Sequence, residues 1–122
     1  MTTAIAIQQD WPWPDSLDAL VAAPESHHLL LENEHVRVLE VRITPGQHVP
    51  VHTHRWPGVL HILSSTDFVR CDADGNVLFD TRQAHNPPVP GSITWAEPFP
   101  PHSMENVGQQ ELLVIAVELK HR

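Results

Sequence analysis

The chain lacks the features that mark several classes of protein. It has a single cysteine, Cys71, so no disulfide framework can form within it. No apolar run approaches the length of a membrane span, and no basic segment followed by an apolar one opens the chain as a secretory signal would. We therefore expect a soluble, cytoplasmic protein without a membrane partner.

Basic residues are also scarce. Seven lysines and arginines stand against 15 aspartates and glutamates, which gives a formal net charge of -8. The basic residues are scattered along the chain, whereas binding to a phosphate backbone needs them clustered. Nucleic acid is thus excluded as a partner. Histidine, in contrast, is abundant, with ten residues.

A length of 122 residues fits one domain. Short β-prone runs separated by glycine and proline turns predict an all-β sandwich or barrel over residues 27–122. Residues 1–26 read as an arm, with a short helix over 17–23 capped by Ser16. Trp11 and Trp13 in this arm are costly to expose, so we expect them to pack on the barrel or on a second subunit of a homodimer.

Alternating and apolar runs mark the strands. The clearest cover residues 27–31, 35–43, 59–63, 67–71, 77–80 and 112–119, with a further strand after Pro45-Gly46. The last run is almost continuously apolar, which predicts a strand buried on both faces, as beneath a partner sheet.

The strand after Pro45-Gly46 carries the first candidate site. Residues two apart on a strand share a face, so His52 and His54 project side by side and fit adjacent positions on a transition metal. His48 has the same parity but lies too far along for direct ligation, which favours a role at the pocket rim. His61 falls on the opposite face unless a bulge at Pro57-Gly58 reverses the count.

The remaining histidines of the first hairpin, namely His27, His28 and His35, are expected on the surface.

A second element lies some fifty residues downstream, where Gly91 is followed by His102 and Asn106. Together with Gly46-x5-His52-x-His54, this resembles the two motifs of the cupin superfamily, G-x5-H-x-H-x3-4-E-x6-G and G-x5-P-x-G-x2-H-x3-N. Two departures stand out. Gly58 or Val59 occupies the place of the motif glutamate, and Glu97 and Phe99 replace the inner proline and glycine of the second motif.

The resemblance implies a small single-domain cupin, a double-stranded β-helix or jelly-roll barrel, in which His52, His54 and His102 hold one divalent metal. Without the glutamate, three neutral imidazoles leave open positions and the full metal charge, which favours anionic or chelating ligands. Three-histidine cupins of this kind include Fe(II) dioxygenases for thiols and diketones, so Fe(II) is favoured, with Zn, Ni, Mn or Cu as alternatives. Asn106, Gln47 and Glu97 are candidates for orienting the rings.

No catalytic residue is assigned beyond the metal ligands. The candidates for a substrate pocket are His48, Trp56, His61, Phe68, Trp95, Phe99 and Met104. The favoured function is an Fe(II)-dependent oxygenation of a small anionic organic molecule. The alternatives are a non-oxidative metal-dependent lyase or isomerase, and a ligand-binding or regulatory cupin without turnover.

Overall fold

The computed structural model describes residues 11–84 and 87–120, so the first ten residues of the predicted arm lie outside it. The elements are η1 (Asp15–Leu17), α2 (Ala19–Ala22), β1 (His27–Glu32), β2 (Val36–Ile43), β3 (His48–His52), β4 (Gly58–Ser64), β5 (Phe68–Asp72), β6 (Val77–Asp80), α3 (Thr81–Ala84), β7 (Ile93–Ala96), β8 (His102–Asn106) and β9 (Leu112–Leu119).

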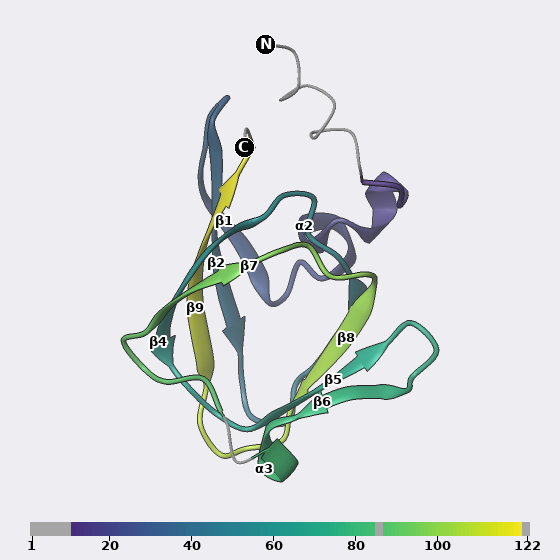
Figure 1. The fold of residues 1–122 in the computed structure, drawn as a ribbon, viewed down its shortest axis with the longest axis vertical. Helices are drawn as coiled ribbons and strands as arrows, with labels where there is room; N and C mark the ends of the chain where they lie inside the picture. Colours follow the sequence, from purple (N-terminus) through teal and green to yellow (C-terminus); the bar gives the residue numbers. More distant parts are fainter. Residues whose placement is uncertain (1–10, 85–86, 121–122) are drawn as a thin grey trace.

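The strands form two sheets, as the all-β prediction required. One has the order β1-β2-β9-β4-β7 and the other the order β3-β8-β5-β6. Every pairing between these strands is antiparallel. Figure 1 shows β2, β9 and β4 on one side of the molecule and β5, β6 and β8 on the other, with the interior between them. No helix in the described ranges is long and apolar enough to cross a membrane.

Alternation along the strands sets the interior. On β2, Leu39 and Ile43 are almost fully buried, as their period-two pattern predicts. The core cluster is apolar and comes from both sheets and from the arm: Ala23, Ile43, Val49, Ile62, Leu112 and Val114. This cluster anchors the strand ends that carry the histidines described below.

The prediction that β9 is buried on both faces is wrong. Its burial alternates along the strand, with one face buried and the other intermediate. β9 lies in the middle of its sheet, and on the outer face apolar side chains of neighbouring strands partly cover one another. The register aligns one such row across all five strands: Leu31, Val38, Val117, Val59 and Trp95.

The arm packs on the barrel through Asp18. The expected helix over 17–23 is interrupted there, because Leu17 and Ala19 form backbone hydrogen bonds with Thr53. Asp18, not Ser16, caps α2 by accepting a hydrogen bond from Leu20 N at 3.2 Å.

The tryptophans of the arm pack within the chain. Trp11 lies edge-on to Trp13 with ring centroids 6.2 Å apart, and the Arg55 guanidinium lies 4.1 Å from the Trp11 ring centroid.

Gly58 marks a close approach of β4 to β9. A Cβ built on Gly58 would lie 2.3 Å from Val117 O and 3.0 Å from Glu118 Cα. Both atoms belong to the backbone at the centre of a sheet and cannot rotate away. The adjacent Val59 pairs with Val117 and Trp95 in the outer row. Neither position of the missing motif glutamate can therefore supply a carboxylate to the interior.

We expect Gly58→Ala to lower the free energy of unfolding by about 3 kcal/mol, because the added methyl collides with fixed backbone. Gly46→Ala is the control: Gly46 has φ 81° with nothing within 4 Å of an added Cβ, so its cost is limited to about 1–2 kcal/mol of backbone strain. Urea unfolding of the two variants measures the difference. Equal losses of unfolding free energy in the two variants would contradict the close approach of β4 to β9.

Candidate metal centre

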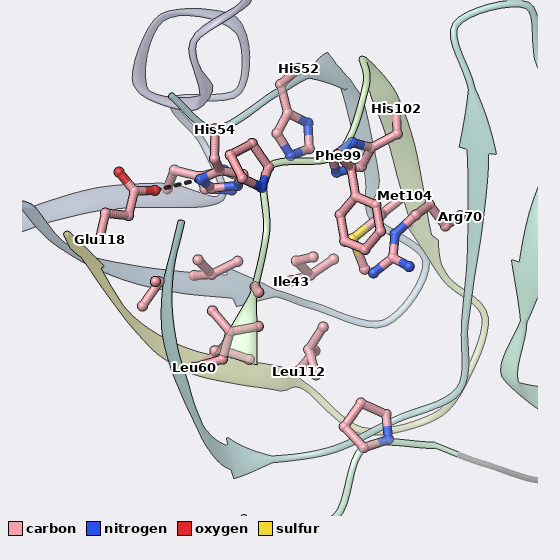
Figure 2. Close-up of a pocket in the computed structure, with 18 of the residues that line it drawn as sticks. Ile43, His52, His54, Leu60, Arg70, Phe99, His102, Met104, Leu112 and Glu118 are labelled. Atoms are coloured by element: carbon pink, nitrogen blue, oxygen red, sulfur yellow. Dashed lines mark hydrogen bonds and ion pairs between the residues drawn. The ribbon is translucent and has the colours of Figure 1, made fainter. Parts of the chain in front are cut away.

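Two of the predicted ligands meet at paired strand ends. β3 ends at His52, β8 begins at His102, and the two residues are direct partners in the register. Their ring centroids lie 4.6 Å apart, and that of His54, two residues further on, lies 5.5 Å from His52. His52 and His102 are 2% and 4% exposed. Figure 2 shows the three rings at one end of a cavity whose other end is apolar.

His27 joins this cluster, which corrects its prediction as a surface residue. It is 4% exposed, and its ring centroid lies 4.9 Å from that of His52 and 5.2 Å from that of His54. One ring nitrogen from each of these three residues falls in a group whose atoms all lie within 4.8 Å of one another. That is the spacing of donors around a single ion.

A signal for His27 was present in the sequence. Its strand is otherwise exposed, with a run of apolar side chains on the surface. In the hairpin, however, His27 pairs with Val41, which shares the inward parity of Leu39 and Ile43. Counting pairs back from the predicted turn would have placed His27 opposite an inward residue.

Main-chain carbonyls fix two of the rings. The Nδ1 of His52 lies 2.8 Å from Pro50 O, and the Nδ1 of His102 lies 2.9 Å from Pro100 O. Because a carbonyl oxygen only accepts, each Nδ1 must carry the proton and donate it. This leaves the Nε2 of each ring with a free lone pair for a metal.

The other two rings are held in the same way. The His27 Nδ1 lies 3.1 Å from Ala23 O. The His54 Nδ1 lies 2.6 Å from a carboxylate oxygen of Glu118, drawn as a dashed line in Figure 2. Histidine ligands of metals characteristically donate their second nitrogen to a carbonyl or carboxylate in this manner. All four imidazoles therefore present the same nitrogen, Nε2, for coordination.

Glu118 belongs to a buried ionic chain. Its other carboxylate oxygen accepts a hydrogen bond from Arg37 Nε at 2.7 Å. The two terminal nitrogens of Arg37 each donate to one carboxylate oxygen of Asp18 at 2.9 Å. All three side chains are at least nine-tenths buried. A fixed carboxylate behind His54 raises the basicity of that ring toward a metal.

Three of the rings are kept neutral by their surroundings. Burial lowers the pKa of each, that of His27 to about 3, that of His52 to about 2 and that of His102 to about 4. Neighbouring imidazoles add to this, since the pKa of His27 is lowered further by His54 and that of His52 by His102. Neutral imidazole is the form that binds metal.

A cavity opens from the histidines into the barrel. The volume of this cavity that is accessible to the centre of a water molecule is about 160 Å³. Its walls are mainly apolar and include Val41, Ile43, Leu60, Ile62, Leu112, Val114 and Ala116. Of the predicted pocket residues, Trp56, Phe68, Phe99 and Met104 line it.

The other three pocket candidates do not line the cavity. A bulge between Val49 and His52 in the β3–β8 pairing reverses parity, so His48 is exposed while Val49 is buried. His61 keeps its counted parity and pairs with Ile93 and Ile115, on the face opposite to the cavity.

Trp95 shares the outer face and is 51% exposed, with its Nε1 donating to a carboxylate oxygen of Glu97 at 2.6 Å.

Two residues expected to orient the rings act elsewhere. The buried Asn106 donates to Ile43 O and Gln110 O at 2.9 and 2.8 Å. Gln47 accepts hydrogen bonds from the main chain and hydroxyl of Thr44. Both stabilise loops at the far end of the strands. Glu97, the third candidate, lines the cavity.

Comparison with solved structures decides the fold. No protein-family model matches the chain, and no curated protein does either. A cupin domain from Bordetella pertussis Tohama I superposes with a TM-score of 0.61 at 19% identity, over 76% of this chain and 90% of that one. The chain has the cupin fold.

Two further structures share it. A protein with a double-stranded β-helix domain from Klebsiella pneumoniae superposes with a TM-score of 0.54 at 20% identity, over 77% of this chain and 75% of that one. The polyketide cyclase RemF from Streptomyces resistomycificus superposes with a TM-score of 0.52 at 17% identity, over 77% of this chain and 63% of that one.

A divalent transition metal fits the residues of this site. Two of the donors are buried, and all are oriented by their Nδ1 partners, which is the chemistry that imidazole-binding metals require. His27, His52 and His54 would hold the ion. His102, expected from the motifs as the third ligand, packs against His52 at 4.6 Å between ring centroids but lies outside this group of three.

Metal binding by His27 is testable against the set expected from the motifs. His27→Ala should weaken Co²⁺ binding at least about tenfold, because loss of a direct ligand costs no less than loss of an outer partner. His28→Ala, one residue along on the exposed face of β1, is the matched control and should leave binding unchanged. Competition titration with a chromophoric chelator measures both. Unchanged affinity in His27→Ala would return the site to His52, His54 and His102.

The lowered pKa values predict acid sensitivity of the metal-free protein. Below pH 6.5 the unfolded chain protonates these histidines while the folded protein excludes the protons, so stability falls as pH falls from 6.5 toward 4. Each ring contributes up to about 1.4 kcal/mol per pH unit. Urea unfolding across this range should give a shallower slope for His52→Gln than for His28→Gln. Identical slopes would show that His52 does not resist protonation.

Proposed function

We propose that this cupin-fold protein is a metal-dependent dioxygenase that uses Fe(II) to oxygenate a small anionic organic molecule. The observation that carries the proposal is the cluster of buried imidazoles, all presenting Nε2, at the end of an apolar cavity. A shared fold does not decide a reaction, so the proposal depends on this site.

The number of donors favours a six-coordinate ion. Three imidazoles, from His27, His52 and His54, leave one position open on a tetrahedral zinc ion, whereas a six-coordinate ion such as Fe(II) keeps enough positions for both a substrate and O2. Bound there, Fe(II) would supply adjacent positions for a substrate and for O2. Without a carboxylate ligand the site retains the full charge of the ion, which favours an anionic substrate.

The chain itself positions and orients the ligand rings and keeps bulk water out of the site. The carbonyls of Pro50 and Pro100 hold His52 and His102 in the tautomer that coordinates. Glu118 does the same for His54 and is itself held by Arg37. The apolar walls exclude bulk water, which strengthens electrostatic interactions at the site.

The test begins with metal analysis of protein purified without added metal or chelator. The metal-free protein is then reconstituted anaerobically with Fe(II) or with Zn(II). Oxygen uptake is measured with acetylacetone and with 3-mercaptopropionate, two small chelating probes. We expect uptake with Fe(II) only, and its loss in His52→Ala but not in His61→Ala, whose site lies on the outer face. Binding of both probes without oxygen uptake would instead indicate a non-catalytic ligand-binding protein.

A second candidate is a non-oxidative reaction in which the metal acts as a Lewis acid. The observation in its favour is the similarity in fold to the polyketide cyclase RemF, at a TM-score of 0.52. Turnover of a probe at equal rates with Fe(II) and Zn(II), without oxygen uptake, would favour this candidate over the dioxygenase.

A further inference from the structure

Arg70 is a partly buried cation with no carboxylate partner among residues 11–84 and 87–120. It lies on β5 and lines the cavity, and its Nε is buried without a hydrogen-bond partner. Burial alone lowers the pKa of its guanidinium, with no neighbouring charge opposing the effect. An arginine in this state is costly, because a buried charge is normally paired.

The other basic residues show that this is unusual for the chain. Every other lysine or arginine in residues 11–84 and 87–120 lies within 4 Å of a carboxylate: Arg37, Arg42, Arg55, Arg82 and Lys120. With a formal net charge of -8, carboxylates are plentiful. Arg70 therefore lacks a carboxylate partner because of where it lies in the cavity, and not because carboxylates are scarce.

Two aromatic rings orient the guanidinium. Its central carbon lies 4.6 Å from the ring centroid of Phe99 and 5.5 Å from that of Phe68. Stacking on aromatic faces occupies the planes of a guanidinium and leaves its edge N–H groups for a ligand. Those groups form the fork that matches the two oxygens of a carboxylate.

Arg70 is also close to the histidines. It pairs with Met104 in the register, and His102 lies two residues from Met104 on the same face of β8. The positive charge of Arg70 contributes to the lowered pKa of His102. Figure 2 shows Arg70 beside Met104 and Phe99, on the same side of the cavity as His102. An anion at Arg70 would thus lie next to the metal centre.

The cavity's own carboxylates do not compensate this charge. Glu118 is held by Arg37 and His54. Glu97 lines the cavity and accepts a hydrogen bond from Trp95, and neither residue lies within ion-pair distance of Arg70.

We infer that Arg70 binds the carboxylate of a small organic acid, whose short apolar body lies in the cavity and extends toward the histidines. Small carboxylic acids are thereby the substrate class of the proposed function. Only their role as substrates rests on that function. Binding of the carboxylate by Arg70 is a property of the metal-free chain as well, and it is measured there.

The experiment compares carboxylates with neutral analogues of the same shape. Butyrate and benzoate, and their amides butyramide and benzamide, are titrated into metal-free protein by calorimetry. We expect the carboxylates to bind wild type and to bind Arg70→Met at least tenfold more weakly. The amides should bind both proteins weakly and alike. Arg82→Met is the matched control, since it removes an exposed arginine paired with Asp80.

Two further measurements separate recognition from structural support. Arg70→Met should melt at the same temperature as wild type or higher, because it removes an uncompensated buried charge. Butyrate should raise the melting temperature of wild type but not of Arg70→Met. Arg70→Lys keeps the charge but loses the fork, and should bind carboxylates with intermediate affinity. A lower melting temperature for Arg70→Met together with unchanged carboxylate affinity would overturn the inference.

The two proposals can fail separately. Arg70-dependent binding of carboxylates without oxygen uptake under any condition would remove the dioxygenase and keep the anion site. Oxygen uptake by Fe(II)-loaded Arg70→Met with an unchanged KM for 3-mercaptopropionate would remove the anion site and keep the dioxygenase.

Discussion

The position of Arg37 between Asp18 and Glu118 is the interaction on which the metal centre depends. It joins the arm, β2 and β9 at one buried point, and through Glu118 it reaches the ring of His54. Removing one member of a buried pair typically costs about 3–5 kcal/mol, because a charge is left uncompensated. The arm is thus part of the architecture of the site, since Asp18 both caps α2 and holds Arg37.

Arg37 and Arg70 differ in how their charges are compensated. Arg37 is satisfied by two carboxylates, whereas Arg70 has aromatic faces and no counter-ion. A folded protein tolerates an unpaired buried charge chiefly where a ligand completes it, because the cost falls on the free state and is recovered on binding. The neutral histidines and the charged Arg70 form a site that is electrostatically incomplete when empty.

Local patterns predicted most of the fold but only part of the site. Strand parity and turn residues placed β2 and the β5–β6 hairpin, because these depend on neighbours in sequence. The meeting of His52 with His102 was expected only from the resemblance to the cupin motifs. His48 was misplaced because a bulge is a tertiary adjustment with no local signature. Arg70 could not be identified as a binding residue from the sequence, because the lack of a carboxylate partner is a property of the folded structure.

Gly58 limits how this barrel can acquire an acidic ligand. Because a side chain at this position would enter the backbone of β9, introducing the glutamate of the cupin motif there would disrupt the sheet and gain no coordination. His27 enters the histidine cluster from a different strand, the edge strand β1. Protein engineers who want a mixed nitrogen–oxygen centre in this scaffold should therefore introduce the carboxylate at residue 27.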